Sequence, residues 1–219
     1  DGIKRGRMIY ANIRKALNYI IAIHVPIAGL SILPLIFNKP LLLFPIHIVI
    51  MELIIDPACS LLFERQQDLE DVMTNPPRAV NSRMFKGWDI LRSILQGGLI
   101  MMVAMSVYYI QSDSEDSENK ARTLTYLMLV WGNIALIFAD LGMGNAQSIK
   151  FYIKRKSTWF ILLGATVFSV AITQFQFLRQ IFHFTHLTSV EFMIPLLGST
   201  FIFLIVSIWN RIATNRARI

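Results

Sequence analysis

The chain has 219 residues, of which 54% are hydrophobic and 16% are charged, and its formal net charge is +7. Soluble globular domains carry about 25% charged residues, so this composition excludes an ordinary soluble domain and indicates a polytopic membrane protein. The positive charge is spread over several segments without a recognisable nucleic-acid-binding module, which argues against a nucleic acid as partner. The single cysteine, Cys59, excludes a disulfide within the chain.

Six apolar segments follow one another along the chain, and each is long enough to cross the lipid core as a helix. Backbone groups in lipid must hydrogen-bond within their own segment, and the segments lack the period-two alternation of a membrane β-barrel. We therefore predict an all-α membrane protein, a bundle of six transmembrane helices, in which Gly97 and Gly98 allow close helix packing. The predicted helices cover about residues 17–37, 41–63, 88–110, 124–141, 158–178 and 192–209.

The distribution of Lys and Arg predicts the orientation of these helices. Only four of the 21 Lys and Arg residues fall on one side of the membrane, namely Lys39, Lys120, Arg122 and Arg179. By the positive-inside rule the other side, which holds both termini, is cytoplasmic. We expect residues 1–16 to form a cytoplasmic stalk, residues 17–219 to form the transmembrane domain, and the bilayer to be the plasma (inner) membrane. Because the chain begins with Asp1 and not with Met, we expect it to be a piece of a longer polypeptide.

Glu52 and Asp56 are the most informative residues of the second predicted helix. They lie one turn apart and share a helix face, although a carboxylate at mid-membrane costs about 2.5–3.5 kcal/mol. Pro57 follows directly and cannot donate the helical hydrogen bond that would reach the carbonyl of Leu53. Carboxylates beside a free carbonyl are typical ligands of a hard cation, so we predict a cation site that faces a protein interior.

A histidine and a proline mark the middle of the first predicted helix. Pro26 is expected to free the carbonyl of Ala22, either beside the cation site or as part of a simple kink. His24 has three interpretations, as a ligand, as a proton carrier or as an interhelical hydrogen-bond partner. His47, nearer the outer end of the second helix, is expected to be structural, and Asp140 is either a third acid of the site or an interfacial residue.

Four short motifs carry a resemblance to a known family. They are Gly6–Lys15 (GRMIYANIRK), Glu52–Asp56 (ELIID), Asp68–Arg78 (DLEDVMTNPPR) and Ala121–Thr123 (ART). The first resembles the stalk that leads into the fifth membrane helix of P-type cation ATPases of the calcium-pump-like branch. The others resemble that family's sixth helix, the linker after it and the entry to its eighth helix. The resemblance covers essentially the whole chain and identifies it as the fifth to tenth membrane helices.

The resemblance implies a cation-binding role for three residues. Asp56 matches the sixth-helix aspartate that coordinates the transported cation, and Glu52 stands where the calcium pumps place an asparagine ligand. His24 stands at a fifth-helix asparagine, whereas Ile27 and Ile55 replace a glutamate and a ligand threonine. One of two calcium sites is therefore largely lost. The resemblance implies one transported divalent cation: Ca²⁺ is the first candidate, Mn²⁺ or Mg²⁺ are alternatives, and a proton is a candidate counter-ion.

The Asp-Lys-Thr-Gly phosphorylation loop of that family is absent from this sequence, and no Walker-type phosphate loop replaces it. By itself the chain is therefore expected not to hydrolyse ATP. Its implied partners are the upstream phosphorylation, nucleotide-binding and actuator domains and the first four membrane helices of the same pump, through which ATP and Mg²⁺ would act. Two alternatives stay open from the residues alone, a stand-alone secondary cation/proton exchanger and a non-transporting membrane scaffold.

Overall fold

The computed structural model describes residues 2–53, 87–111, 118–141 and 154–216. Within these residues the chain is helical and contains no strand. The helices are α1 (Gly2–Ile36), a helix over residues 45–53, α3 (Gly87–Gln111), α4 (Glu118–Leu141), α6 (Lys156–Gln174), α7 (Gln176–Phe182) and α8 (Met193–Arg216). In this part of the chain α1, α3, α4, α6 and α8 are long and apolar enough to cross a membrane. These findings confirm an all-α, multi-pass membrane protein, while much of the second predicted helix lies outside the described residues.

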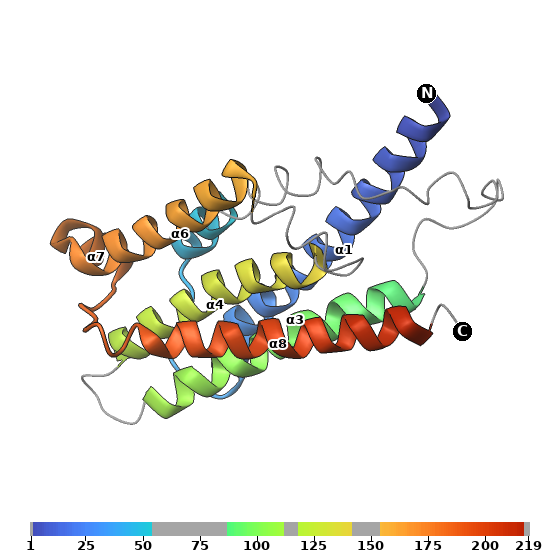
Figure 1. Cartoon of the computed structure of the whole chain (residues 1–219). Helices are drawn as coiled ribbons and strands as arrows, with labels where there is room; N and C mark the ends of the chain where they lie inside the picture. Colours follow the sequence, from blue (N-terminus) through green and yellow to red (C-terminus); the bar gives the residue numbers. More distant parts are fainter. Residues whose placement is uncertain (1, 54–86, 112–117, 142–153, 217–219) are drawn as a thin grey trace.

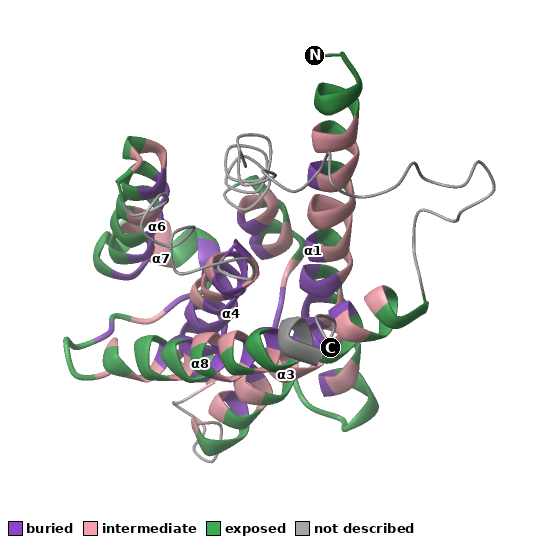
Figure 2. Cartoon of the chain, turned by 45° about the vertical axis from the view of Figure 1, so that its right-hand side comes forward, coloured by how far each residue is buried: buried purple, intermediate pink, exposed green. Residues whose placement is uncertain are grey.

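Helix α4 lies at the centre of the bundle (Figure 1, Figure 2). Its most apolar stretch is 83% buried, whereas the corresponding stretches of the other four candidate spans are between 28% and 39% buried. Helices α3 and α8 pack along α4, and α1 packs mainly on α3. The start of α1 and the end of α8 lie toward the same end of the bundle (Figure 1). The apolar side chains that the outer helices leave exposed are suited to contact lipid.

The predicted stalk and the first predicted helix form one continuous element, α1, which runs through Pro26 and Pro34. Membrane helices accommodate proline because neighbouring groups can satisfy the backbone that it frees. The helix ends at Ile36 and is followed by a turn in which Asn38 has a φ of 52°, in the left-handed region, and the N–H of Lys39 bonds to the carbonyl of Pro34 at 2.8 Å. This left-handed ending is the usual way in which a helix closes its last carbonyls.

Gly97 sets the close contact between α1 and α3, as its sequence context predicts. A Cβ added there would collide with the carbonyl oxygen of Ala22 and would lie 2.8 Å from Cβ of Val25. At Gly98 an added Cβ would meet nothing within 4 Å, so this second glycine is not needed for the contact. The carbonyl of Ala22, which Pro26 cannot bond, therefore faces the backbone of α3.

The second predicted helix begins at residue 45 rather than at residue 41. Pro45 occupies its first position, where a missing N–H costs nothing. The N–H of Phe44 donates to Nδ1 of His47 at 3.1 Å, and the carbonyl of Leu41 accepts from Arg122 at 3.1 Å. The bond from Phe44 to His47 therefore caps the start of the helix, and the bond from Arg122 ties the segment before it to α4.

The prediction that the fifth helix covers residues 158–178 is wrong beyond Gln174, where α6 ends. Phe175 has an extended backbone with φ −79° and ψ 121°, and it separates α6 from the short helix α7. The side-chain amide of Gln174 donates to the carbonyl of Leu187 at 3.2 Å. Phe182, at the end of α7, is buried. The break allows the chain to place these groups against the rest of the bundle, which a straight helix would not do.

Candidate functional site

The structure brings His24 and Glu52 together, although 28 positions separate them in the sequence. His24 lies on α1 and Glu52 lies on the 45–53 helix, and Nε2 of the histidine is 3.7 Å from Oε1 of the glutamate. Their side chains are 53% and 40% exposed, respectively. Asp56 and Pro57 lie outside the described residues. His24 and Glu52 therefore form one side of a polar site on two neighbouring helices.

One ring nitrogen of His24 has a definite role. Its Nδ1 lies 2.8 Å from the carbonyl oxygen of Ile20, one turn earlier in α1. Because a carbonyl oxygen can only accept, Nδ1 carries a hydrogen, and in the neutral ring Nε2 then presents its lone pair. That lone pair is on the nitrogen that approaches Glu52. This arrangement offers a nitrogen donor and an oxygen donor to the same space.

Membrane physics restricts what can cover this pair. A charged side chain inside a bilayer costs several kcal/mol against lipid and is found facing protein or water-filled space. His24 and Glu52 point away from the core of the described bundle, as their exposed fractions show. We therefore expect the exposed side of the pair to face protein or water-filled space and not lipid.

Asn133 is a polar residue of the bundle interior that sequence reasoning missed. It lies on α4 and is fully buried, and its Nδ2 is 3.9 Å from Sδ of Met51 on the 45–53 helix. Among the described residues its Oδ1 has no hydrogen-bond partner, while the hydroxyl of Tyr19 donates to its backbone carbonyl at 3.2 Å. A lone amide in the middle of an apolar segment was the sequence signal. Its unpartnered oxygen is a further potential donor.

Asp140 belongs to a different cluster. Its Oδ1 accepts hydrogen bonds from Arg92 at 3.0 Å, from Gln96 at 2.9 Å and from Asn210 at 3.1 Å. Arg92 also donates to Oδ1 of Asn210 at 2.8 Å. These contacts join α3, α4 and α8, and all three bonds to the carboxylate fall on Oδ1. Asp140 is therefore an interhelical ion-pair residue in this structure, and it is not joined to His24 and Glu52.

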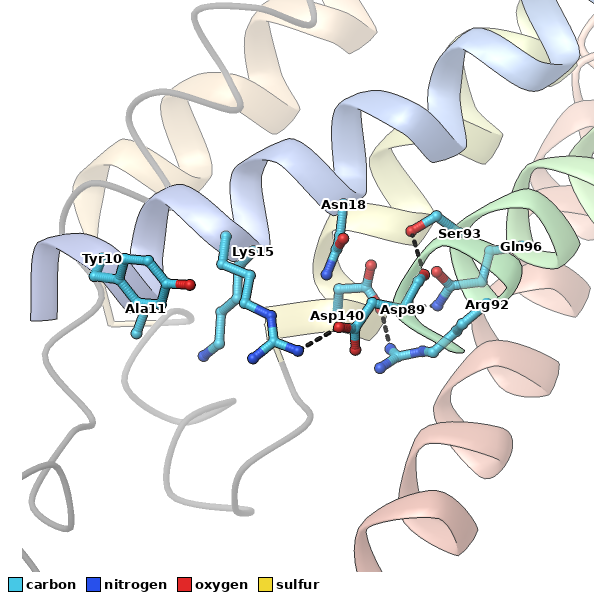
Figure 3. A pocket seen from close by; sticks show the side chains of 10 residues that line it. Tyr10, Ala11, Lys15, Asn18, Asp89, Arg92, Ser93, Gln96 and Asp140 are labelled. Atoms are coloured by element: carbon cyan, nitrogen blue, oxygen red, sulfur yellow. Dashed lines mark hydrogen bonds and ion pairs between the residues drawn. The ribbon is translucent and has the colours of Figure 1, made fainter. Parts of the chain in front are cut away.

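A pocket of about 420 Å³ lies beside this cluster, between α1, α3 and α4 (Figure 3). Figure 3 shows Arg92, Gln96 and Asp140 gathered at one end of the pocket and Tyr10 at the other. Arg14 of α1 forms an ion pair with Asp89 of α3 within it. The two ion pairs of the pocket thus tie α1 to α3 and α3 to α4.

The opposite end of the bundle is held by aromatic and charged contacts. Nδ1 of His47 accepts from Phe44, so its Nε2–H donates to the carbonyl of Phe182 at 2.8 Å, and its ring stacks on Phe184 with centroids 4.8 Å apart. The prediction that His47 is structural agrees with these contacts. Nearby, Lys120 pairs with Glu191. The described residues contain no group of three or more His, Cys, Asp or Glu that could hold a metal ion.

Five helices of the described residues are long and apolar enough to cross a membrane, and together with the approach of His24 to Glu52 they define the class as a multi-pass membrane protein. Residues 40–212 match the family model described as cation transporting ATPase, C-terminus. The chain therefore belongs to the P-type cation-transporting ATPases, as a C-terminal membrane segment, which confirms the resemblance seen in its sequence.

Two curated relatives carry the name calcium-transporting ATPase. The one from Bacillus subtilis (strain 168) is 29% identical over 144 residues, which is 63% of this chain and 16% of that protein. The one from Plasmodium falciparum (isolate K1 / Thailand) is 27% identical over 110 residues, which is 49% of this chain and 9% of that protein. The chain thus matches less than one fifth of the length of either relative.

Proposed function

We propose that this chain is the cation-binding membrane domain of an ATP-driven pump that moves a divalent cation across the plasma membrane. Glu52, Asp56 and His24 are the proposed ligands. The observation that carries the proposal is the 3.7 Å approach of His24 Nε2 to Glu52 Oε1 between two apolar helices. The names of the two relatives make Ca²⁺ the first candidate, with Mn²⁺ or Mg²⁺ as alternatives. Membership of the ATPase family favours a pump over an exchanger or a scaffold.

Helix α1 is the proposed coupling element between ATP hydrolysis and the site. It is continuous from Gly2 to Ile36, so about 33 Å of helix separates its start from His24 at 1.5 Å per residue. The Arg14–Asp89 and Arg92–Asp140 pairs link α1 to α3 and α3 to α4. Movement of the cytoplasmic end of α1 would therefore reach His24 and shift it against Glu52. ATP and Mg²⁺ would bind in upstream domains of the complete pump.

Asn133 is a proposed additional oxygen donor. Its Oδ1 is buried and has no partner among the described residues, and its Nδ2 approaches Met51, the neighbour of Glu52. An amide oxygen is an accepted ligand of hard divalent cations. The oxygen of Asn133 faces the bundle interior, whereas His24 and Glu52 point away from that interior, so Asn133 would serve the cation at a neighbouring position and not beside the pair.

The proposal is tested in the complete pump by replacing Asp56 with Asn and, separately, Glu52 with Gln. Both variants should lose cation-stimulated ATPase activity by about 100-fold or more, the scale of other lost charge contacts in catalysis. Phosphorylation of the pump by inorganic phosphate should persist, because it does not require the bound cation. Glu191→Gln, whose carboxylate pairs with Lys120 and not with His24, is the matched control and should keep normal activity. Wild-type cation-dependent turnover in both site variants would refute the proposed ligands.

A further inference from the structure

The two donor atoms that meet at the site are an oxygen and a nitrogen. Glu52 offers a carboxylate oxygen, and His24 offers the Nε2 lone pair, because Nδ1 is used by the carbonyl of Ile20 at 2.8 Å. In the neutral ring this lone pair and the carboxylate oxygen lie 3.7 Å apart, and in the protonated ring the same contact is an ion pair. The separation is longer than a hydrogen bond, and in the neutral ring the two acceptors are stabilised by a positive species between them.

The separation of these donors accepts a metal ion. With ligand distances of about 2.1 Å, typical of nitrogen and oxygen on a transition metal, a gap of 3.7 Å corresponds to a nitrogen–metal–oxygen angle of about 120°. A larger ion such as Ca²⁺, with ligand distances of about 2.3–2.6 Å, would also fit between them. The spacing therefore fits both classes of ion, and the choice between them depends on whether the donor atoms are nitrogen or oxygen.

A nitrogen among the donor atoms favours a transition metal over Ca²⁺ or Mg²⁺. Ca²⁺ and Mg²⁺ take oxygen ligands almost entirely, whereas imidazole nitrogen binds first-row divalent transition metals, with affinity rising from Mn²⁺ to Co²⁺ and beyond, and Zn²⁺ bound readily. The geometry points to a site that transports a first-row divalent transition cation, of the Zn²⁺, Co²⁺ and Mn²⁺ class, in preference to Ca²⁺ and Mg²⁺. This inference rests on the proposed function and replaces its first candidate, Ca²⁺, on the strength of the His24 nitrogen.

The first test measures activation of the complete pump by separate cations. ATPase activity is titrated with Zn²⁺, Co²⁺, Mn²⁺ and Ca²⁺ in wild type, in His24→Asn and in the control His186→Asn, whose histidine is exposed in the loop before α8. The wild type and the control should respond to the transition cations at lower concentration than to Ca²⁺. His24→Asn should raise the half-activating transition-metal concentration by at least about 10-fold, the loss that even outer-shell partners of a metal produce when mutated. Its Ca²⁺ response should change much less.

The second test observes the nitrogen directly. Mn²⁺ bound to the complete pump is examined by pulsed electron paramagnetic resonance for coupling to a ¹⁴N nucleus. The coupling should be present in wild type and in His186→Asn and should disappear in His24→Asn. Phosphorylation by inorganic phosphate shows whether His24→Asn is folded. If that variant does not fold, the wild-type spectrum decides alone, because absence of ¹⁴N coupling there overturns the inference.

Failure of this inference differs from failure of the proposed function. If Ca²⁺ activates the wild type at lower concentration than every transition cation and His24→Asn alters all responses alike, the transition-metal preference is overturned and the pump proposal stands. If no divalent cation stimulates the wild-type pump and none binds to it, the proposed function falls, and the inference falls with it.

Discussion

Two carboxylates in the membrane helices of this chain differ sharply in their surroundings. Asp140 accepts three hydrogen bonds from α3 and α8, and its side chain is 13% exposed. Glu52 is 40% exposed and approaches only the ring of His24, at 3.7 Å, among the contacts of the described residues. A carboxylate that accepts several hydrogen bonds holds helices together, whereas one that approaches a single histidine ring has oxygen atoms left to bind a ligand. The role of a carboxylate in a membrane helix therefore depends on its hydrogen-bond partners more than on its charge.

The largest expected effect is on the free energy of unfolding, which should fall when Asp140 is replaced but not when Glu52 is replaced. Asp140→Ala leaves Arg92 without its carboxylate between helices, and breaking such a pair costs about 3–5 kcal/mol. Glu52→Gln removes no hydrogen bond of the described residues and should change stability by less than about 0.5 kcal/mol. The measurement is the thermal unfolding of both variants of the complete pump in detergent.

A rescue variant controls this comparison. Replacing the pair with apolar side chains, Arg92→Met together with Asp140→Leu, should recover most of the stability, because a buried pair and a well-packed apolar pair are often equivalent. If Glu52→Gln destabilised the pump more than Asp140→Ala does, the structural role assigned to Asp140 and the non-structural role assigned to Glu52 would both be contradicted.

A smaller effect concerns the packing that places His24. Gly97→Ala puts a methyl group against the carbonyl of Ala22 and the side chain of Val25, so α1 must move away from α3. Overpacking of this kind costs about 1–3 kcal/mol, and because His24 is carried by α1, the cation concentration for half-maximal ATPase activity should rise as well. Gly98→Ala, which meets open space, is the matched control. Equal effects of the two alanines on stability and activation would contradict this account of the α1–α3 contact.

The smallest expected effect is a pH dependence at the other end of the bundle. The Lys120 ammonium and hydrogen bonds from the backbone and hydroxyl of Thr188 lower the pKa of Glu191 from 4.5 to about 2. A carboxylate whose pKa is lowered by folding contributes its full stability above pH 4.5 and loses it as the pH falls toward 2. As an ion pair near the surface it should contribute about 0.2–1 kcal/mol.

Unfolding at a series of pH values checks this pair. The difference in stability between wild type and Glu191→Gln should be constant from about pH 7 to pH 5 and should shrink below pH 4.5. A difference that grew on acidification would contradict the direction of the pKa shift of Glu191.

The sequence predicts the parts of this molecule that depend on local composition. Apolar segments predict the membrane helices because span length is set by the bilayer, and five of them appear in the described residues. The end of α6 could not be predicted, because the break at Phe175 is accompanied by contacts outside the helix, from Gln174 to Leu187 and from Phe182 to the distant His47. Likewise, the role of Asp140 depends on Arg92 and Asn210, which lie far from it in the chain.

The candidate site shows the same division. The cost of an acid in an apolar segment singles out Glu52 from sequence alone, and the structure adds its proximity to His24. The roles of His24, Glu52 and Asp56 as cation ligands stay predictions, and Asp56 lies outside the described residues. Asn133 escaped prediction because an amide carries no charge, and only the packing of α4 shows that its oxygen lacks a partner within the described part of the chain.

Equilibrium binding of radioactive divalent cations to the complete pump tests the central claim most directly. The account predicts that wild type and Glu191→Gln bind one transition cation per pump, and that Glu52→Gln loses that binding by about 100-fold, close to 2.7 kcal/mol, while remaining folded. Binding of the same cation to Glu52→Gln with wild-type affinity would show that the charge of Glu52 does not hold the transported ion.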